Sequence, residues 1–166
     1  MDEATLEAFA QTQYQQGGLW ADYFHTNNFT SFARSQVDSQ INMTWPTGSP
    51  SGISYSYWSA RWTGQLDIQQ EDSYTFSGNT DHPLKVWVDG QLIIDQASSG
   101  AFTSQAINLT VGRHEFVTEF DKNTSTRVAA LNLAWSYTNV VEELIPASAF
   151  YYRRPGISGQ LILSQF

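Results

Sequence analysis

The sequence of 166 residues contains no cysteine, which excludes disulfide bonds, thiolate catalysis and a zinc site built on thiolates. It has only 8 basic residues against 16 acidic ones, for a formal net charge of −8. It therefore lacks the basic surface typical of proteins that bind duplex DNA or anionic membranes. Its uninterrupted apolar stretches are about four residues long, too short to span a bilayer. We expect neither a nucleic-acid partner nor a membrane-spanning segment.

Charged residues are scarce as well, at 14% of the chain against about a quarter in an average globular protein. Ser, Thr, Asn and Gln together supply about a third of the residues. Aromatic residues account for 14%, far too many for a disordered segment, and the length suits one domain with a sizeable core. The composition indicates a single folded domain with a polar, weakly charged surface.

Only the first sixteen residues have a helical pattern. Leu6, Phe9 and Tyr14 approximate a stripe with the period of an α-helix, and Gly17-Gly18 is a typical helix stop. The segment lacks the basic and apolar regions of a signal peptide. We expect residues 1–16 to be a short helical lead-in.

From residue 19 onward apolar and polar residues alternate, as in β-strands with one buried face. The alternation predicts strands at residues 19–24, 41–45, 57–68, 73–76, 84–88, 91–95, 105–109, 114–120 and 129–137. Asp89-Gly90 separates two of them and predicts a type I′ hairpin turn, because both residues tolerate φ > 0. The pattern predicts an all-β fold, either an antiparallel β-sandwich or a barrel.

The expected domain runs from residue 17 to residue 152. Residues 153–166 change in composition, and we interpret them as a linker or the start of a next module, with Leu161–Leu163 as a candidate edge strand. We expect the chain to be one domain of a larger protein. Four N-glycosylation patterns occur, at Asn28, Asn42, Asn108 and Asn123.

Motifs that support catalysis are few. The chain lacks Gly-x-Ser-x-Gly, a phosphate-binding Gly-rich loop and His-Glu-x-x-His. Its three histidines, His25, His82 and His114, are far apart in the sequence. Glu142 and Glu143 are adjacent, so on a strand they would point to opposite faces. These features favour a binding module over an enzyme.

Two polar segments are candidate recognition loops, since loops on a rigid sandwich commonly carry binding residues. Residues 79–83 (Asn-Thr-Asp-His-Pro) precede the predicted hairpin, and residues 121–124 (Asp-Lys-Asn-Thr) follow the strand at 114–120. Their oxygen-bearing side chains suit a hard cation such as Ca²⁺, which takes 6–8 oxygen ligands. The same residue types are also ordinary turn formers, so both interpretations stay open.

Aromatic residues offer a second kind of recognition group, because sugars present apolar C–H faces that pack on exposed rings. Trp62, Trp87 and Trp135 lie inside strand patterns, and we expect them in the core. Trp45, Tyr57 and Trp58 flank the loop at residues 46–52, and they are candidates for an exposed platform.

Several motifs occur in a fixed order along the chain. They are Gly18-Leu19 with Tyr23-Phe24, Ser59-Ala60-Arg61-Trp62-Thr63-Gly64, Tyr74-Thr75-Phe76, Asp81, Val86-Trp87-Val88-Asp89-Gly90 with Ile93-Ile94-Asp95, Leu131-x-Leu133-x-Trp135 and Ile145-Pro146. With these motifs the sequence resembles the PA-fourteen family, a domain found in many glycosidases and adhesins. The resemblance extends from about Gly18 to Tyr151 and implies a β-sandwich or barrel of the protective-antigen type.

The resemblance also implies a ligand site. In yeast adhesins of this family two consecutive aspartates hold a calcium ion, and sugar hydroxyls complete its coordination. Here Asp81 matches the first aspartate. His82 stands at the position of the second aspartate, and Pro83 stands where the family has a glycine. The second loop would contribute Asn123, together with Asp121. The implied calcium ligands are therefore Asp81, Asp121 and Asn123.

The resemblance implies a non-catalytic, extracellular or cell-surface module that binds a glycan or cell-surface polysaccharide, with calcium as a possible cofactor. The expected ligand-binding residues are Asp81, His82, Asn123, Trp45, Tyr57 and Trp58. The alternative is a structural or protein–protein interaction module of a larger surface or toxin-like protein, which would contact neighbouring domains of the same chain.

Overall fold

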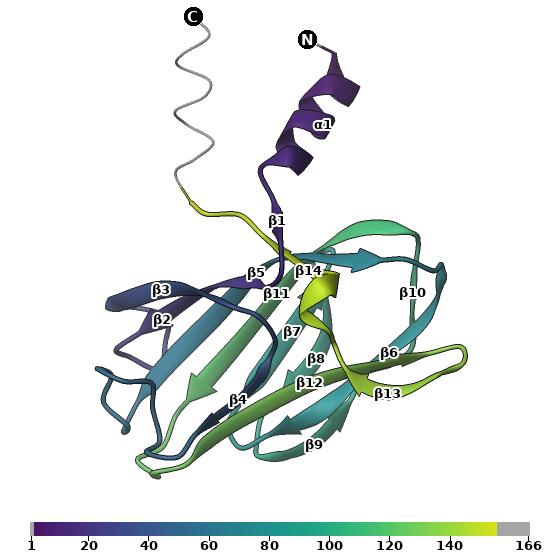
Figure 1. Cartoon of the computed structure of the whole chain (residues 1–166). Coiled ribbons are helices and arrows are strands. Elements are labelled where there is room, and N and C mark those ends of the chain that lie inside the picture. The colour runs from purple at the N-terminus through teal and green to yellow at the C-terminus, as the bar shows by residue number, and fades with distance from the viewer. Residues whose placement is uncertain (1, 156–166) are drawn as a thin grey trace, which may run out of the picture.

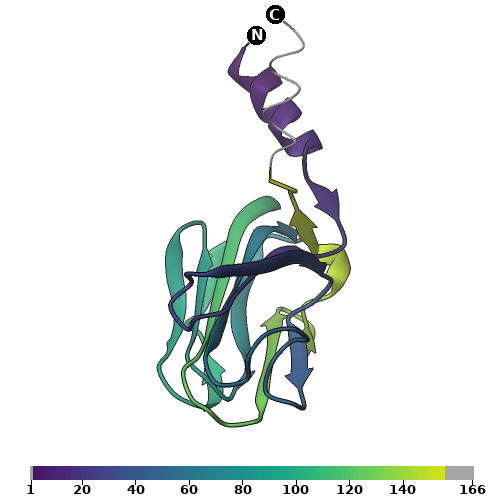
Figure 2. The same cartoon turned by 90° about the vertical axis from the view of Figure 1, so that its left-hand side faces the viewer.

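Alternating buried and exposed side chains fold the chain into two antiparallel β-sheets that face each other (Figures 1 and 2). The coordinates are a computed structural model, which describes residues 2–155. The helices are α1 (Glu3–Thr12) and the 3₁₀ turn η1 (Ala147–Ala149). The strands are β1 (Gln15–Gln16), β2 (Leu19–Phe24), β3 (Phe32–Asp38), β4 (Asn42–Trp45), β5 (Trp58–Ile68), β6 (Asp72–Thr80), β7 (Leu84–Val88), β8 (Gln91–Gln96), β9 (Gly100–Thr103), β10 (Ile107–Leu109), β11 (Gly112–Lys122), β12 (Ala129–Tyr137), β13 (Val140–Leu144) and β14 (Phe150–Tyr152). The predicted all-β sandwich is confirmed.

One sheet has eight strands, in the order β1-β14-β5-β11-β7-β8, with β2 between β5 and β3. The other has six, in the order β10-β6-β12-β13, with β4 on β12 and β9 on β6. The long strands β5 and β11 pair over their whole length, from Trp58↔Lys122 to Ile68↔Gly112. This central pair places Trp58 beside Lys122 at one end of the eight-stranded sheet and Ile68 beside Gly112 at the other.

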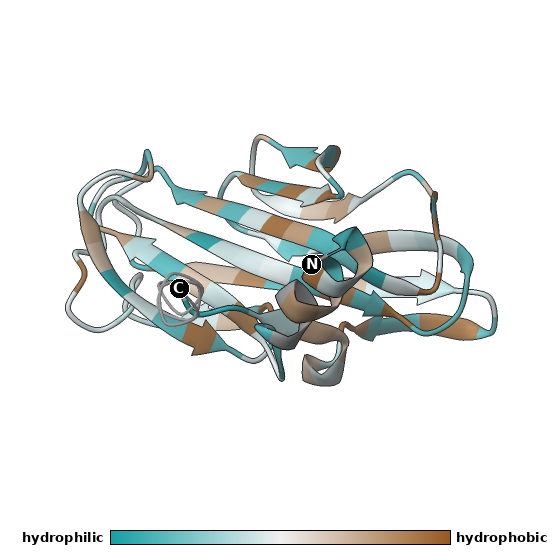
Figure 3. Ribbon diagram, turned by 90° about the horizontal axis from the view of Figure 1, so that it is seen from above, coloured by the Kyte–Doolittle hydropathy of each residue, from teal (hydrophilic) through white to brown (hydrophobic). Residues whose placement is uncertain are grey.

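The core lies between the sheets and is rich in aromatic residues. Along β11, Phe116, Thr118, Phe120 and Lys122 face inward and are buried, while the residues between them face out. The same alternation of hydrophobic and hydrophilic residues is visible along the other strands (Figure 3). The largest side chains that fill the core are Trp58, Trp62, Tyr23, Tyr74, Phe76, Phe116, Phe120 and Phe150.

The hairpin between β7 and β8 turns at Asp89-Gly90, as predicted. Asp89 has φ 50° and Gly90 has φ 76°, the left-handed values that a type I′ turn requires. The Asp89 carboxylate adds a hydrogen bond from the backbone N–H of Glu115 (2.9 Å) and one with Nδ1 of His114 (2.6 Å). This turn is therefore fastened to β11 as well as to its own strands.

The lead-in helix is shorter than expected. It ends at Thr12, because Gln15 and Gln16 form β1 and pair with Tyr152 and Tyr151 of β14. Figures 1 and 2 show α1 extending away from the two sheets. Neither described helix is long and apolar enough to cross a membrane. Most of the expected tail, including Leu161–Leu163, lies outside the described residues.

Candidate functional site

The two polar segments predicted as recognition loops meet at one end of the sandwich. The backbone N–H of Asp121 donates to the carbonyl of Pro83 (3.0 Å), which joins the end of β11 to the start of β7. On the other side, Asp81 donates its N–H to the carbonyl of Ala130 (3.2 Å) and accepts the Ala130 N–H on Oδ1 (2.9 Å). The segment that contains Asp81 is thus held between β11 and β12, beside the loop that contains Asn123.

His82 faces the interior, where it is buried with 4% of its surface exposed. Its Nε2 lies 3.2 Å from the carbonyl of Val128 and 3.7 Å from Oδ1 of Asp81, and its ring packs edge-on against Phe120. The imidazole therefore fastens the Asp81 segment to the second loop. A ligand contact by His82 does not agree with this burial.

Lys122 is the buried cation of the site. Its side chain passes under the second loop, and its Nζ donates to the carbonyls of Thr124 and Thr126, both at 2.7 Å. Burial lowers the pKa of Lys122, and the nearby carboxylate of Asp81 raises it in part. The ammonium thus holds the second loop by its carbonyls and lies near enough to Asp81 to feel its charge. Sequence reasoning missed this role, because a lysine in a polar turn is usually exposed.

The expected calcium ligands do not form a calcium-binding shell. Oδ1 of Asp81 accepts a backbone N–H, Asn123 is exposed, and two loop carbonyls already accept bonds from Lys122. Within residues 2–155, no group of three or more His, Cys, Asp or Glu residues is placed to hold a metal. Because Ca²⁺ needs 6–8 oxygen ligands, the donors present here do not fit the ion. Calcium binding stays a prediction that this geometry does not favour.

A hollow of about 410 Å³ opens beside the junction of the two segments. It is lined by Phe29, Pro83, Leu84, Lys85, Asp95, Gln96, Ala97, Glu119 and Asp121. The lining combines apolar surface with carboxylate, amide and ammonium groups, which suits a ligand that has hydroxyl groups and apolar faces. We call this hollow the loop-end pocket.

Asp121 is the most perturbed acid of the loop-end pocket. Its Oδ1 is buried and has no hydrogen-bond partner within the described part of the chain. Burial raises the pKa of Asp121, while a hydrogen bond from Asn27 and the nearby His82 lower it in part. A buried carboxylate oxygen without a partner costs free energy, which agrees with the raised pKa of Asp121.

The expected aromatic platform is only partly exposed. Trp58 is fully buried, and its Nε1 donates to the carbonyl of Gly48 at 2.8 Å. The prediction of an exposed Trp58 is wrong, because the alternation of β5 places it on the inner face with Ala60 and Trp62. Trp45 is half-buried against Trp58, with ring centroids 4.8 Å apart, and Tyr57 is 50% exposed.

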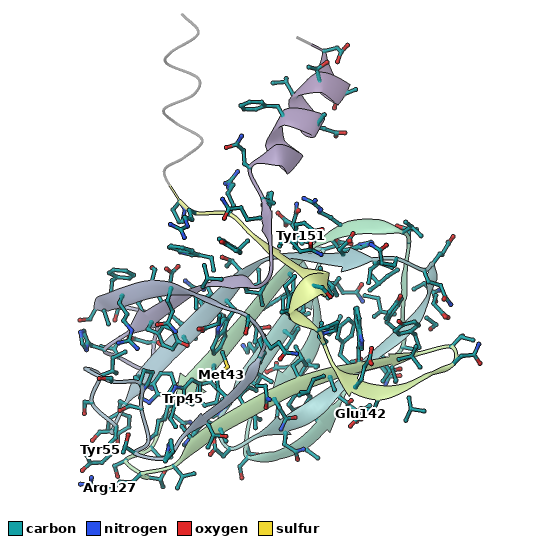
Figure 4. The ribbon with its side chains drawn as sticks, viewed as in Figure 1. Met43, Trp45, Tyr55, Arg127, Glu142 and Tyr151 are labelled. Carbon is teal, nitrogen blue, oxygen red and sulfur yellow. The ribbon has the colours of Figure 1, made fainter. Side chains whose placement is uncertain are left out.

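The loop at residues 46–57 nevertheless lies against the second polar loop. The guanidinium of Arg127 stacks on the ring of Tyr55, 4.2 Å from its centroid, and Figure 4 shows the two side chains together at this end of the sandwich. A Cβ on Gly48 would lie 2.9 Å from the Cα of Arg127. The structure thus brings three loops together here: 46–57, 81–83 and 123–128.

A larger hollow, of about 500 Å³, lies at the opposite end of the sandwich. Tyr74, Trp135 and Tyr137 supply its aromatic wall, and the core position predicted for Trp135 is confirmed. Its polar groups bond within the protein: Trp135 Nε1 donates to Glu143 (3.1 Å), and Gln16 Nε2 donates to the carbonyl of Ser148 (2.7 Å). Two of its polar side chains are therefore engaged within the protein.

Comparisons with known proteins agree with this architecture. The anti-sigma-I factor RsgI3 of Acetivibrio thermocellus is 32% identical over 137 residues, which cover 81% of this chain and 21% of that protein. A solved anti-sigma factor domain-containing protein is 29% identical with a TM-score of 0.78, over 86% of this chain and 50% of that one. A PA14 sugar-binding domain from an RTX adhesin shares the fold, with a TM-score of 0.68, 14% identity, and coverage of 83% and 99%.

The chain spans only about a fifth of the length of the curated relatives it matches. A family model described as "PA14 domain" matches residues 15–149, from β1 to η1. This range contains every strand of both sheets except β14, and all residues that line the loop-end pocket. The chain therefore belongs to the PA14 domain family.

Proposed function

We propose that this chain is a non-catalytic carbohydrate-binding module that holds its ligand in the loop-end pocket. The observation that carries the proposal is the pocket itself, whose lining places Asp121, Lys85 and Gln96 together with the apolar surface of Phe29. Charged and amide groups can hydrogen-bond to sugar hydroxyls, while an aromatic ring packs on a sugar's C–H face.

The relatives support the proposal at the level of the family. One solved neighbour is titled as a sugar-binding domain of an adhesin, and others are parts of anti-sigma factors. The same module thus accompanies parent proteins with different roles, as a recognition domain would. We extend the proposal to an extracellular or cell-surface location, where polysaccharides are available as ligands.

We further propose that binding does not require calcium. The Lys122 ammonium already supplies a buried positive charge near Asp81, and it makes two hydrogen bonds to loop carbonyls. Binding that disappears in EDTA and returns with Ca²⁺ would contradict this part of the proposal alone.

A glycan array probed with the purified chain, in EDTA and in calcium, tests the main proposal. We expect binding in both conditions, and we expect Asp121→Asn to weaken it by at least about tenfold, which corresponds to about 1.4 kcal/mol. Phe32→Ala is the matched control, because Phe32 is 60% exposed and does not line the pocket. The absence of binding to any glycan in both conditions would end the lectin proposal.

The second candidate function is a protein-contact module within a larger protein. Within residues 2–155, strand β13 pairs with β12 alone and has no strand on its other edge, and its Val141 is 87% exposed. An exposed apolar edge strand is a typical docking surface for another chain or domain. If the array is empty, protection of β13 from hydrogen exchange in the parent protein would support this candidate.

A further inference from the structure

The outer face of the eight-stranded sheet has a straight row of side chains that the proposed function does not use. Strand pairing places Trp87 of β7 beside Val117 of β11, Val117 beside Thr63 of β5, and Thr63 beside Trp20 of β2. All four are half-buried, whereas their neighbours along each strand face the core. Trp87 was expected in the core; this expectation is wrong, because the period-two alternation of β7 sends Leu84, Val86 and Val88 inward instead.

Hollows follow this row without interruption. One of about 250 Å³ is lined by Trp87 and Val117, and a second of about 310 Å³ is lined by Val117, Thr63 and Trp20. The first also shares Glu119 with the loop-end pocket. Trp87 and Trp20 are three strand spacings apart, about 14 Å. We call this row and its hollows the sheet groove.

The sheet groove is not covered by the helix α1, which extends away from the sandwich (Figures 1 and 2). Its far end, next to Trp20, is bounded by Tyr14, Arg153 and Pro155. Among the described residues, the lining of the two hollows runs from Glu119, which also lines the loop-end pocket, across the strands to Trp20. A single sugar ring could not reach both tryptophans.

Charge limits what the groove can accept. Asp22, Glu115 and Glu119 line it, and the basic residue among its lining side chains is Arg153. Arg61 neutralises Glu119, with its guanidinium 2.6 Å from the carboxylate. Acidic residues still outnumber basic ones in the groove lining, as they do in the whole chain. An anionic chain would be repelled, while carboxylates can accept hydrogen bonds from neutral hydroxyl groups.

We propose that the sheet groove binds the interior of a neutral, extended, β-linked polysaccharide chain, with Trp87 and Trp20 as its two stacking positions. A straight groove across a sheet fits a flat, extended ribbon of sugars better than a coiled one. The inference rests on the proposed function in that the ligand is a glycan. It adds the ligand class, a neutral chain bound along its length rather than at one terminal sugar.

Isothermal titration calorimetry with cellohexaose and cellobiose tests the inference on the full chain. We expect cellohexaose to bind at least about tenfold more tightly than cellobiose, a difference of about 1.4 kcal/mol. Trp87→Ala should remove this advantage, and Phe32→Ala, on an exposed aromatic residue outside the groove, should keep it. Val117→Lys, which fills the middle of the groove, is the second variant, and a thermal melt of each variant verifies folding.

The outcomes separate the two proposals. Equal affinity for both oligosaccharides, unchanged cellohexaose binding in folded Trp87→Ala and Val117→Lys, or tighter binding of oligogalacturonate would overturn the groove. Glycan binding that depends on Asp121 but not on Trp87 would overturn the groove and leave the loop-end pocket standing. If no glycan binds, both proposals fail together.

Discussion

Replacing Lys122 with methionine tests how the loop at residues 123–128 is held in place. Methionine retains much of the buried aliphatic stem but removes the ammonium. In the wild type, the carbonyls of Thr124 and Thr126 each accept a hydrogen bond from the Lys122 ammonium at 2.7 Å. In the variant they lose this donor, and Asp81 loses a nearby positive charge. We expect the substitution to loosen the loop at residues 123–128 without changing the two sheets.

The size of the effect follows from opposing contributions. A hydrogen bond to a charged group contributes about 1.5–3 kcal/mol net, so two bonds set an upper limit of about 3–6 kcal/mol. Burial of the ammonium offsets several kcal/mol of that gain. Thr124 and Thr126 are exposed, so water can satisfy their carbonyls in the variant. We therefore expect a loss of about 1–3 kcal/mol, which lowers Tm by about 2–10 °C for a domain of this size.

Differential scanning calorimetry measures the loss, and limited trypsin digestion reports where it occurs. Cleavage after Arg127, which lies in the affected loop, should become faster in Lys122→Met. Lys85→Met is the matched control, because Lys85 is the other lysine of the sequence and its side chain is exposed. Equal Tm values for the wild type and both variants, with unchanged cleavage after Arg127, would refute the role assigned to the ammonium.

Three other substitutions test the fold around the site. Asp89→Ala should cost about 1–3 kcal/mol in a thermal melt, because it removes the acceptor for the Glu115 N–H and places a less tolerant residue at φ 50°; Asp89→Asn should cost less. Burial lowers the pKa of His114, but hydrogen bonds to Asp89 and to a backbone carbonyl raise it by more, so the net shift is upward. The stabilisation from His114 is therefore complete below the unfolded-state pKa of about 6.5, and it is lost as the pH rises through the pKa of the folded state. His114→Gln should thus destabilise the domain more at about pH 5.5 than at about pH 8. An equal effect at both pH values would contradict the upward shift. Gly78→Ala should lower the free energy of unfolding by at least about 2 kcal/mol, because the added Cβ would meet the backbone carbonyl of Asn132 on β12. A melting curve equal to that of the wild type would contradict this.

The sequence predicted most of the fold, because strong alternation identifies strands with one face in the core. It predicted the nine strongest strands and the turn at Asp89-Gly90. It missed β1, β3, β9, β13 and β14, which are short or half-exposed and therefore lack a clear pattern. Pairing with neighbouring strands, rather than local sequence, makes these segments extended.

The site was less predictable. The approach of Asp81 to the second loop agrees with the expectation from the family resemblance, since both segments flank strands that end at the same edge. The burial of Trp58 and the exposure of Trp87 were not expected, because a tryptophan beside a loop looks exposed and one inside a strand looks buried. Only the register of the sheet decides which face each ring takes.

The loop-end pocket and the sheet groove make different demands on the protein, so one pair of variants can distinguish their contributions. Asp121 lines the pocket at the end of β11, whereas strand pairing fixes the positions of Trp87 and Trp20 in the groove. If affinity for cellohexaose comes mainly from the groove, Asp121→Asn should keep most of it and Trp87→Ala should lose it. If affinity comes mainly from the pocket, the order reverses, and calorimetric titration of both folded variants with the same oligosaccharide gives the answer.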